Sequence, residues 1–182
     1  MRLFVGIPLA EVTVRELASV VSRLRPQAGK LRWTEPQSWH ITLQFLGNTT
    51  PEQLDCLSAR LVEVRSAPVP VQLGELGLFD RAGIFFADVT LTPALVALQQ
   101  RVAAATGFCG FVAEPRPFHP HITLVRAKDQ GRAAQLRELR KKILSQSTFQ
   151  RFTADEFLLY ESHLSAEGAR YEIRRRFPLA GS

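Results

Sequence analysis

The tetrapeptide His-Ile-Thr-Leu occurs twice in the chain, at residues 40–43 and 121–124. The copies are 81 residues apart (121 − 40 = 81), and they hold two of only four histidines among 182 residues. In each copy polar and apolar residues alternate, which is typical of a strand with one buried face. A chain built on two such strands is expected to fold into two quasi-symmetric halves, each contributing one copy.

The alternation also predicts where the polar side chains of each copy point. Residues i and i+2 of a strand lie on the same face, so each copy projects an imidazole and a hydroxyl side by side while Ile and Leu enter the core. If the two halves pack against each other, the two strands meet. The cleft between them would then hold His40, Thr42, His121 and Thr123.

These four groups suit the hydrolysis of a cyclic phosphodiester. In-line attack at phosphorus needs a base on the water and an acid on the leaving oxygen. Imidazole titrates near ~6.5 and serves in either role. Threonine hydroxyls donate to phosphoryl oxygens as negative charge accumulates there. The reaction requires no metal ion, and we expect no cofactor.

The remainder of the sequence alternates predicted strands and helices, with no flexible linker and no low-complexity segment. Helices interrupt hairpins, which favours an α+β fold with antiparallel sheets over a doubly wound parallel sheet. No glycine-rich phosphate loop follows a strand, which disfavours Rossmann and P-loop chemistry. The predicted strands are 1–7, 30–33, 39–46, 69–79, 84–91, 121–125, 153–160 and 170–177, and the predicted helices are 8–26, 51–62, 93–107 and 132–147.

Composition limits the class of protein and of partner. Lys and Arg number 23 against 17 Asp and Glu, and the net charge of +6 favours an anionic, phosphate-bearing partner. The two cysteines, Cys56 and Cys109, cannot build a disulfide framework or a four-cysteine zinc site, and we expect buried thiols in a reducing cytosol. No apolar run reaches the ~20 residues that span a bilayer. We expect a cytoplasmic monomer with one domain over 1–182.

Two longer segments carry a family resemblance. Residues 39–47 (WHITLQFLG) and 116–126 (RPFHPHITLVR) resemble the paired motifs of the two-histidine (2H) phosphoesterases. The closest resemblance is to the bacterial and archaeal RNA 2′,3′-cyclic phosphodiesterases, also named 2′-5′ RNA ligases. The first strand and the closing hairpin are also similar, so the resemblance covers nearly the whole chain. It implies a bilobal, pseudo-twofold fold with two antiparallel sheets and outer helices around a central cleft.

The resemblance also implies an activity and roles for the repeated residues. The expected reaction is hydrolysis of 2′,3′-cyclic phosphate RNA ends to a 2′-phosphate, and some members join tRNA halves through 2′-5′ linkages without a nucleotide cofactor. By residue, His40 and His121 would be the acid–base pair, and Thr42 and Thr123 the phosphate ligands. To leave a 2′-phosphate, one histidine must protonate O3′, and we assign His40 as general acid and His121 as general base.

The chain departs from the family pattern at three positions. Gln44 stands where relatives often carry Lys, and Phe86 stands where Trp is expected. These two departures put one cationic contact and one base-stacking contact in doubt. His119 adds a histidine two residues before His121, and such a pair can bind zinc. Because Pro120 separates the two and no third ligand is evident, a solvent-facing position at the cleft rim is favoured.

Four further residues are candidates for substrate binding. Arg126 could bind a phosphate oxygen, although a regular strand would point it away from His121, so that a bulge or the strand's end would have to turn it back. Trp39, Phe118 and Tyr171 could stack on RNA bases, or they could lie in the core.

Three other functions remain open at this point. The same cleft chemistry would serve small cyclic nucleotides or ADP-ribose cyclic phosphate. A non-catalytic RNA-binding module could keep the fold, although a pure binder has no need of two titrating imidazoles. A metallophosphoesterase would need a cluster of Asp and His ligands that the sequence does not show.

Overall fold

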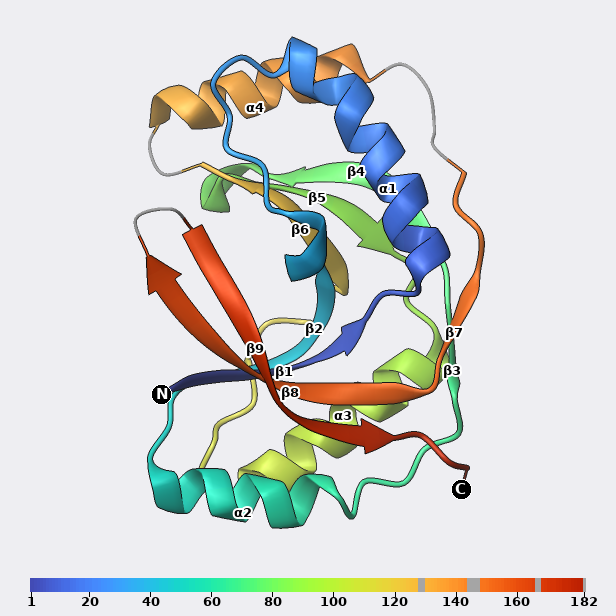
Figure 1. Cartoon of the computed structure of the whole chain (residues 1–182), viewed down its shortest axis with the longest axis vertical. Helices are drawn as coiled ribbons and strands as arrows, with labels where there is room; N and C mark the ends of the chain where they lie inside the picture. Colours follow the sequence, from blue (N-terminus) through green and yellow to red (C-terminus); the bar gives the residue numbers. More distant parts are fainter. Residues whose placement is uncertain (128–129, 144–147, 166–167, 182) are drawn as a thin grey trace.

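The computed structural model of the chain describes residues 1–127, 130–143, 148–165 and 168–181 (Figure 1). A four-stranded antiparallel sheet has the strand order β2-β1-β8-β9. A three-stranded antiparallel sheet has the order β4-β5-β6, and β3 pairs with β7 in a short ribbon. The strands are β1 (Arg2–Pro8), β2 (His40–Asn48), β3 (Val69–Val71), β4 (Leu73–Phe79), β5 (Ile84–Val89), β6 (His121–Arg126), β7 (Phe152–Ala154), β8 (Glu156–Ser165) and β9 (Gly168–Pro178).

The four α-helices in the described residues lie on the outside of the sheets. In Figure 1, α1 and α4 lie together at the top, while α2 and α3 lie together at the bottom. No described helix is long and apolar enough to cross a membrane. The helices are α1 (Glu11–Leu24), α2 (Pro51–Leu61), α3 (Pro93–Gly107) and α4 (Gln130–Lys142), with 3₁₀ turns at Arg25–Gln27, Pro36–Ser38 and Asp80–Ala82.

Local sequence signals fix where the two lower helices begin. Thr50 caps α2 in a capping box, because its Oγ1 accepts from the backbone N–H of Gln53 and the Gln53 side chain accepts from the N–H of Thr50. Thr92 caps α3 through the N–H of Leu95, and each cap is followed by proline at the first helical position. Both starts agree with the prediction from sequence.

The two halves of the chain repeat one pattern of elements. A strand, a helix, the strand with the repeated tetrapeptide and a second helix follow one another as β1-α1-β2-α2 and again as β5-α3-β6-α4. In each sheet the repeated strand forms the edge, and these edges, β2 and β6, contact each other. The predicted α+β fold with antiparallel sheets is therefore confirmed.

Some predicted elements differ in detail. The predicted strand 69–79 is divided into β3 and β4 at Gln72, whose side chain donates to the backbone oxygens of Leu73 and Phe149. Of the predicted strand 30–33, only Trp33 forms a bridge, to Val125. The predicted helix 132–147 is observed as α4, which ends at Lys142, and residues 144–147 lie outside the described residues.

The apolar residues of the repeated strands anchor them in one core. Ile41 and Leu43 of β2 are 0% and 3% exposed, and Ile122 and Leu124 of β6 are both 0% exposed. All four belong to one cluster that includes residues of both larger sheets. This burial fixes the register of each strand, because a slip of one residue would turn its apolar residues to the cleft.

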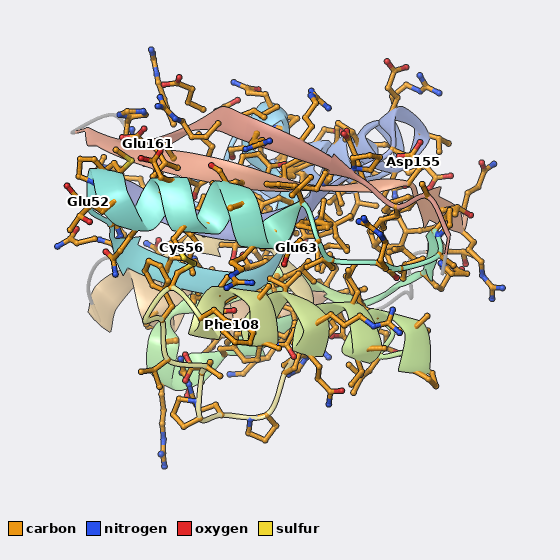
Figure 2. All side chains as sticks on the ribbon, turned by 90° about the horizontal axis from the view of Figure 1, so that it is seen from below. Glu52, Cys56, Glu63, Phe108, Asp155 and Glu161 are labelled. Atoms are coloured by element: carbon orange, nitrogen blue, oxygen red, sulfur yellow. A yellow bond between two sulfur atoms is a disulfide. The ribbon has the colours of Figure 1, made fainter. Side chains whose placement is uncertain are left out.

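The prediction for the cysteines was wrong. Cys56 of α2 and Cys109, just after α3, form a disulfide with a Cα–Cα distance of 5.7 Å. Figure 2 shows the face on which α2 and α3 run side by side, with Cys56 opposite the end of α3. A count of two cysteines excludes a disulfide framework, but it does not exclude a single bridge. The packing of α2 on α3 brings together residues that are 53 positions apart.

We expect this disulfide to stabilise the fold. Closing a loop of this length restricts the unfolded chain, so the change Cys56→Ala with Cys109→Ala should lower the free energy of unfolding by about 2–4 kcal/mol. Urea denaturation with and without a reductant measures the effect, and the double variant, which has no thiols, serves as the control. An unchanged midpoint in the parent upon full reduction would contradict the prediction.

Candidate active site

A hollow of about 410 Å³ opens where the two repeated strands meet. Its lining includes both histidines and both threonines of the repeats, together with Arg126 and Tyr171. The sequence therefore predicted correctly that the two copies of the tetrapeptide come together. Among the described residues, no Asp or Glu lines the hollow, and the fixed charges of this lining, those of Arg2 and Arg126, are positive.

Each strand brings its polar pair to the hollow by simple alternation. His40 and Thr42 are half-buried on the cleft side of β2, and His121 and Thr123 take the same positions on β6. The intervening isoleucines are 0% exposed. Burial on one face thus holds the reactive groups on the other.

A bulge lies at the last residue of each tetrapeptide and changes which later side chain reaches the hollow. On β2, Gly6 and Val5 of β1 pair with Thr42 and Gln44, which leaves Leu43 as the extra residue. On β6, Phe86 and Phe85 pair with Thr123 and Val125, which leaves Leu124 as the extra residue. The extra residue shifts the alternation by one position.

The two bulges place Phe45 and Arg126 at equivalent points of the hollow. Each follows its histidine by five positions (45 − 40 = 126 − 121 = 5), and both line the hollow. The bulge that would turn Arg126 toward the side of His121 is thus present. Phe45 was missed, although the identical offset from the histidine was a signal that could have found it.

The same hydrogen bond fixes the orientation of both imidazoles. Nδ1 of His40 lies 2.8 Å from the carbonyl oxygen of Ser38, and Nδ1 of His121 lies 2.8 Å from that of His119. A carbonyl oxygen only accepts, so each Nδ1 carries a proton and donates. In the neutral ring Nε2 then has a free lone pair, and Nε2 of His40 lies 3.1 Å from Oγ1 of Thr42.

Burial disfavours the charged form of both histidines. It lowers the pKa of His40 from its usual 6.5 to about 4, and the positive charges of Arg126 and His121 act in the same direction, against the raising effect of the Ser38 carbonyl. Burial also lowers the pKa of His121, assisted by His119 and Arg126, while the carbonyl of His119 and the carboxylate of Asp88 oppose the shift. A bound anion would offset the repulsion from Arg126.

Aromatic rings form the wall of the hollow beside His40. Phe4 lies over the imidazole with ring centroids 4.6 Å apart, and Tyr171 meets it edge-on at 5.1 Å. Phe45 is 61% exposed and lies 6.3 Å from Phe4. Phe45 and the half-buried Tyr171 offer apolar surface to the hollow, whereas Phe4 is 3% exposed and packs between His40 and Tyr160.

The connection before β2 ties the two repeats together. Trp39 directly precedes His40, and its Nε1–H donates to Oγ1 of Thr34 at 2.9 Å. That hydroxyl in turn donates to the carbonyl oxygen of Thr123 at 2.8 Å, and the backbone N–H of Thr34 donates to that of Leu124 at 2.8 Å. Residue 34 thus satisfies backbone oxygens at the β6 bulge and fixes the strand that carries Thr123.

Sequence comparison places the chain in a family. The sequence profile of the 2′-5′ RNA ligase superfamily matches residues 13–166. The chain belongs to the 2′-5′ RNA ligase superfamily. A Geobacillus stearothermophilus protein named RNA 2′,3′-cyclic phosphodiesterase is 32% identical over 98% of the chain, which spans 57% of that protein's length. Proteins of the same name from Bacillus subtilis and Escherichia coli are 26% and 28% identical, and in each the match covers 96% of their length.

Solved structures share the fold. The apo structure of E. coli LigT has a TM-score of 0.80 at 24% identity, with 98% of this chain and 96% of that chain covered. The structure of TT0787 from Thermus thermophilus has a TM-score of 0.82 at 25% identity, with 100% and 99% covered. The bilobal fold that the resemblance implied is thus confirmed, because the chain shares its fold with these solved structures.

Two of the three aromatic residues considered for stacking on RNA do not line the hollow. Trp39 is 5% exposed and packs in the main core, where its Nε1–H donates to Oγ1 of Thr34. Phe118 is half-buried and packs against the same core. Both lie where the chain enters a repeated strand, and at such a point an apolar side chain contributes more by closing the core than by meeting solvent. Tyr171, in contrast, lies in the hollow.

The two departures from the superfamily pattern also point away from the hollow. Gln44 is 4% exposed, and its Oε1 accepts from Oγ1 of Thr106 in α3 at 2.8 Å. Phe86 is 5% exposed and stacks on Phe79 at 4.1 Å. An ideal Cβ at Gly77 would lie 2.4 Å from this ring, so a residue without a side chain makes room for it. Because neither side chain reaches the hollow, Gln44 and Phe86 do not cost it a cationic contact or a stacking contact.

The remaining histidines form pairs outside the hollow. His119 has a side chain that is 52% exposed, and its Nε2 lies 2.8 Å from Oδ1 of Asp88. His163 lies on β8 with its Nε2 3.3 Å from Glu172. Within the described ranges, one group of three donors could hold a metal ion, formed by Glu161, His163 and Glu172, but Arg174 pairs with both of its carboxylates.

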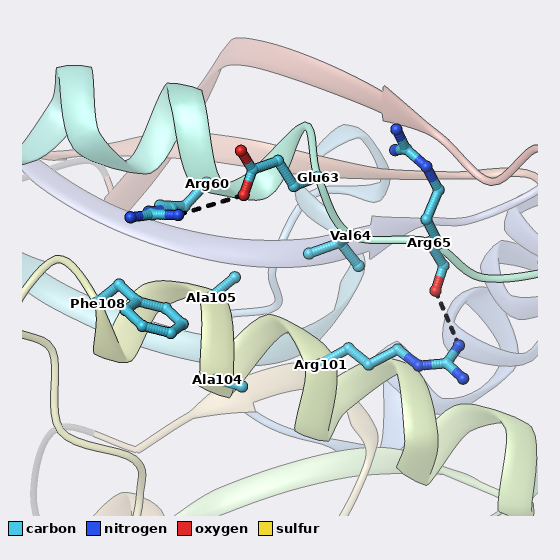
Figure 3. A pocket seen from close by; sticks show the side chains of 8 residues that line it. All are labelled: Arg60, Glu63, Val64, Arg65, Arg101, Ala104, Ala105 and Phe108. Carbon is cyan, nitrogen blue, oxygen red and sulfur yellow. Dashed lines mark hydrogen bonds and ion pairs between the residues drawn. The ribbon is translucent and has the colours of Figure 1, made fainter.

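A second hollow of about 480 Å³ lies between α2 and α3 (Figure 3). Its arginines are already engaged: Arg60 pairs with Glu63 and lies over the ring of Phe108, and Arg101 donates to the backbone oxygen of Arg65. No histidine is among the residues that line it. The first hollow, which holds both repeated histidines, is therefore the candidate site for acid–base chemistry.

Proposed function

We propose that the protein hydrolyses RNA ends that carry a 2′,3′-cyclic phosphate and leaves a 2′-phosphate. The observation that carries the proposal is the pair of imidazoles of equal orientation in one positively charged hollow, each beside a threonine hydroxyl. The names of the relatives support it. The repeated strands and the core that holds both sheets support a single functional unit of two interwoven halves over residues 1–182.

The step balances with the groups present. Nε2 of His121 takes a proton from water as the water oxygen attacks phosphorus, the P–O3′ bond breaks, and Nε2 of His40 gives its proton to O3′. The product keeps the phosphate on O2′, and the two histidines have exchanged protonation states. Thr42, Thr123 and Arg126 would hold the non-bridging oxygens as charge accumulates on them.

The aromatic wall supports the assignment of acid and base. The leaving O3′ stays attached to the terminal nucleoside, so the acid must be the histidine on the nucleoside side. Phe45 and Tyr171 line the hollow on the side of His40, where a base could stack on them. On the side of His121, the rings of Phe79 and Phe86 stack on each other, and neither lines the hollow. His40 is accordingly the acid and His121 the base.

The rate of this reaction should depend on pH in a bell-shaped manner. One histidine must be charged and the other neutral, and because the pKa values of both lie below 6.5, kcat/KM should be highest below pH 6.5 and should fall as the pH rises. The bound phosphate offsets the charge of Arg126, so the falling limb of kcat should lie at higher pH than that of kcat/KM. A flat kcat/KM between about pH 5 and pH 8 would contradict a two-histidine mechanism.

The direct test uses an RNA oligonucleotide that ends in a 2′,3′-cyclic phosphate, incubated in excess chelator. The expected product resists a 3′-specific phosphatase, as a 2′-phosphate does. A 3′-phosphate would contradict the regiochemistry, and loss of turnover on chelation would support a metallophosphoesterase. Absence of turnover by the parent would favour small cyclic nucleotides as substrates. Absence of turnover on those as well would favour an RNA-binding module.

Three finer statements belong to the same proposal. We infer that tRNA halves are among the RNA substrates, that the protein acts as a monomer and that it works in the cytoplasm. The hollow is built from one chain, which supports a monomer. The Cys56–Cys109 bond would then have to persist in a reducing compartment, so thiol labelling in intact cells tests the location: a protected, oxidised pair throughout the population would argue against the cytoplasm.

A further inference from the structure

The hollow holds a second arginine that the hydrolytic step does not use. Arg2, the first residue of β1, lines the hollow together with Arg126. The reacting phosphoryl group already has two threonines and Arg126 for its oxygens. Arg2 therefore needs a different explanation.

The register of β1 places Arg2 beyond the histidine pair. Side chains on the cleft face alternate along the strand as Gly6, Phe4 and Arg2. An ideal Cβ at Gly6 would lie 3.4 Å from the His40 ring, and the ring centroid of Phe4 lies 4.6 Å from that of His40. Two further residues at about 3.4 Å each put the Cα of Arg2 about 7 Å beyond that of Phe4. Arg2 thus marks the outer end of the cleft on the side of His40.

Tyr171 lies in the reach of both arginines. Burial raises the pKa of its phenol, and the charges of Arg126 and Arg2 both act against that shift. The hollow thus has one guanidinium near the reacting phosphate and one at its outer end, with Tyr171 and the exposed ring of Phe45 in its lining. Cationic groups interleaved with exposed rings are the pattern by which proteins hold a single nucleic-acid strand.

In the part of the chain that the structure describes, neither cleft arginine pairs with a carboxylate. Of the residues that line the hollow, none is acidic, and the ion pairs of the described residues do not include Arg2 or Arg126. By contrast, Arg174 and Arg176 of β9 pair with carboxylates of β8 or β9. A guanidinium held without a counter-ion in a hollow favours an anionic ligand.

We propose that Arg2 binds the phosphodiester that joins the terminal nucleotide of the substrate to the nucleotide before it. This inference rests on the proposed function and deepens it. It makes an oligonucleotide, rather than a cyclic mononucleotide, the preferred substrate. The terminal nucleoside lies against Phe45 and Tyr171, with its cyclic phosphate between the histidines and its 5′ phosphodiester at Arg2.

The test compares three substrates that share the same terminal nucleotide with a 2′,3′-cyclic phosphate. The first is the mononucleotide, the second a dinucleotide with a normal internal phosphodiester, and the third a dinucleotide with an uncharged methylphosphonate at that linkage. For the parent we expect kcat/KM to be about 10–100-fold higher for the charged dinucleotide than for the other two, as one charge-assisted hydrogen bond supplies.

The variant Arg2→Gln should bring the ratio of kcat/KM for the charged dinucleotide over the mononucleotide to about one, and Arg2→Lys should restore part of it. Arg151→Gln, which removes an exposed positive charge outside the cleft lining, should leave the ratio unchanged. An equal fall for all substrates in Arg2→Gln, or a parent with no preference for the charged linkage, would overturn the inference alone. A parent inactive on every cyclic phosphate would overturn the proposed function and this inference together.

Discussion

Replacing either His40 or His121 by alanine is expected to lower kcat on RNA with a 2′,3′-cyclic phosphate end by about 10²–10⁴-fold. Each imidazole presents Nε2 to the hollow while Nδ1 is tied to a backbone oxygen, so alanine removes the proton donor or acceptor without a nearby replacement. The kcat of the double variant should be little lower than that of the less active single variant, because acid and base act in one step. Single-turnover kinetics measures these effects directly.

The matched control for the histidines is His163→Ala, which removes an imidazole that lies outside the hollow and pairs with Glu172. Its kcat should stay within about twofold of the parent, since surface substitutions away from such sites are near neutral. Melting curves of all variants exclude unfolding as the cause of a loss. A His40→Ala or His121→Ala variant that keeps a tenth of the parental kcat would refute the acid–base pair.

Thr42→Ala and Thr123→Ala should each slow turnover by about 10²–10³-fold, the cost of removing one donor to charge that develops in the transition state. The loss should appear in kcat more than in KM, because the negative charge on the phosphoryl oxygens grows during the step. Serine at either position keeps the hydroxyl and should restore most of the rate. Steady-state kinetics with the charged dinucleotide separates the two parameters.

Thr153→Ala provides the comparison for the threonines, since Thr153 is an exposed strand residue of β7 outside the hollow. Thr42 has a second contact, because its Oγ1 lies 3.1 Å from Nε2 of His40. The variant Thr42→Ala should therefore also shift the pH profile of kcat. This contact gives no reason to expect such a shift in Thr123→Ala. Rates of the alanine variants within twofold of the parent would remove the proposed role in holding the phosphate.

Much of the active site could be predicted from sequence because it depends on local geometry. The period of a strand is two, so His40 and Thr42 had to share one face while Ile41 and Leu43 shared the other. The burial of Ile41 and Leu43 confirms this reading, and the second copy behaves in the same way. The repeat itself predicted that the two copies would meet, and β2 and β6 do contact each other.

Alternation could not predict the residues that follow each tetrapeptide. A bulge adds one residue to a strand and reverses the facing of everything after it, and nothing in the sequence around Leu43 or Leu124 signals one. The bulges bring Phe45 and Arg126 into the hollow and send Gln44 into the protein. The sequence left the place of Trp39 open for a related reason: whether an aromatic residue at a strand's start meets solvent or joins the core depends on what packs over it.

The sequence by itself determined the α+β class, the caps of α2 and α3 and the pairing of two imidazoles with two hydroxyls, because each depends on spacing within one element. Which ring nitrogen faces the hollow is also set locally, since each Nδ1 donates to the carbonyl oxygen of the residue two positions earlier, Ser38 or His119. Tertiary structure alone decided that Cys56 meets Cys109 and that Arg2 and Arg126 share one cleft. These features depend on distances between elements, which the order of residues along the chain does not specify.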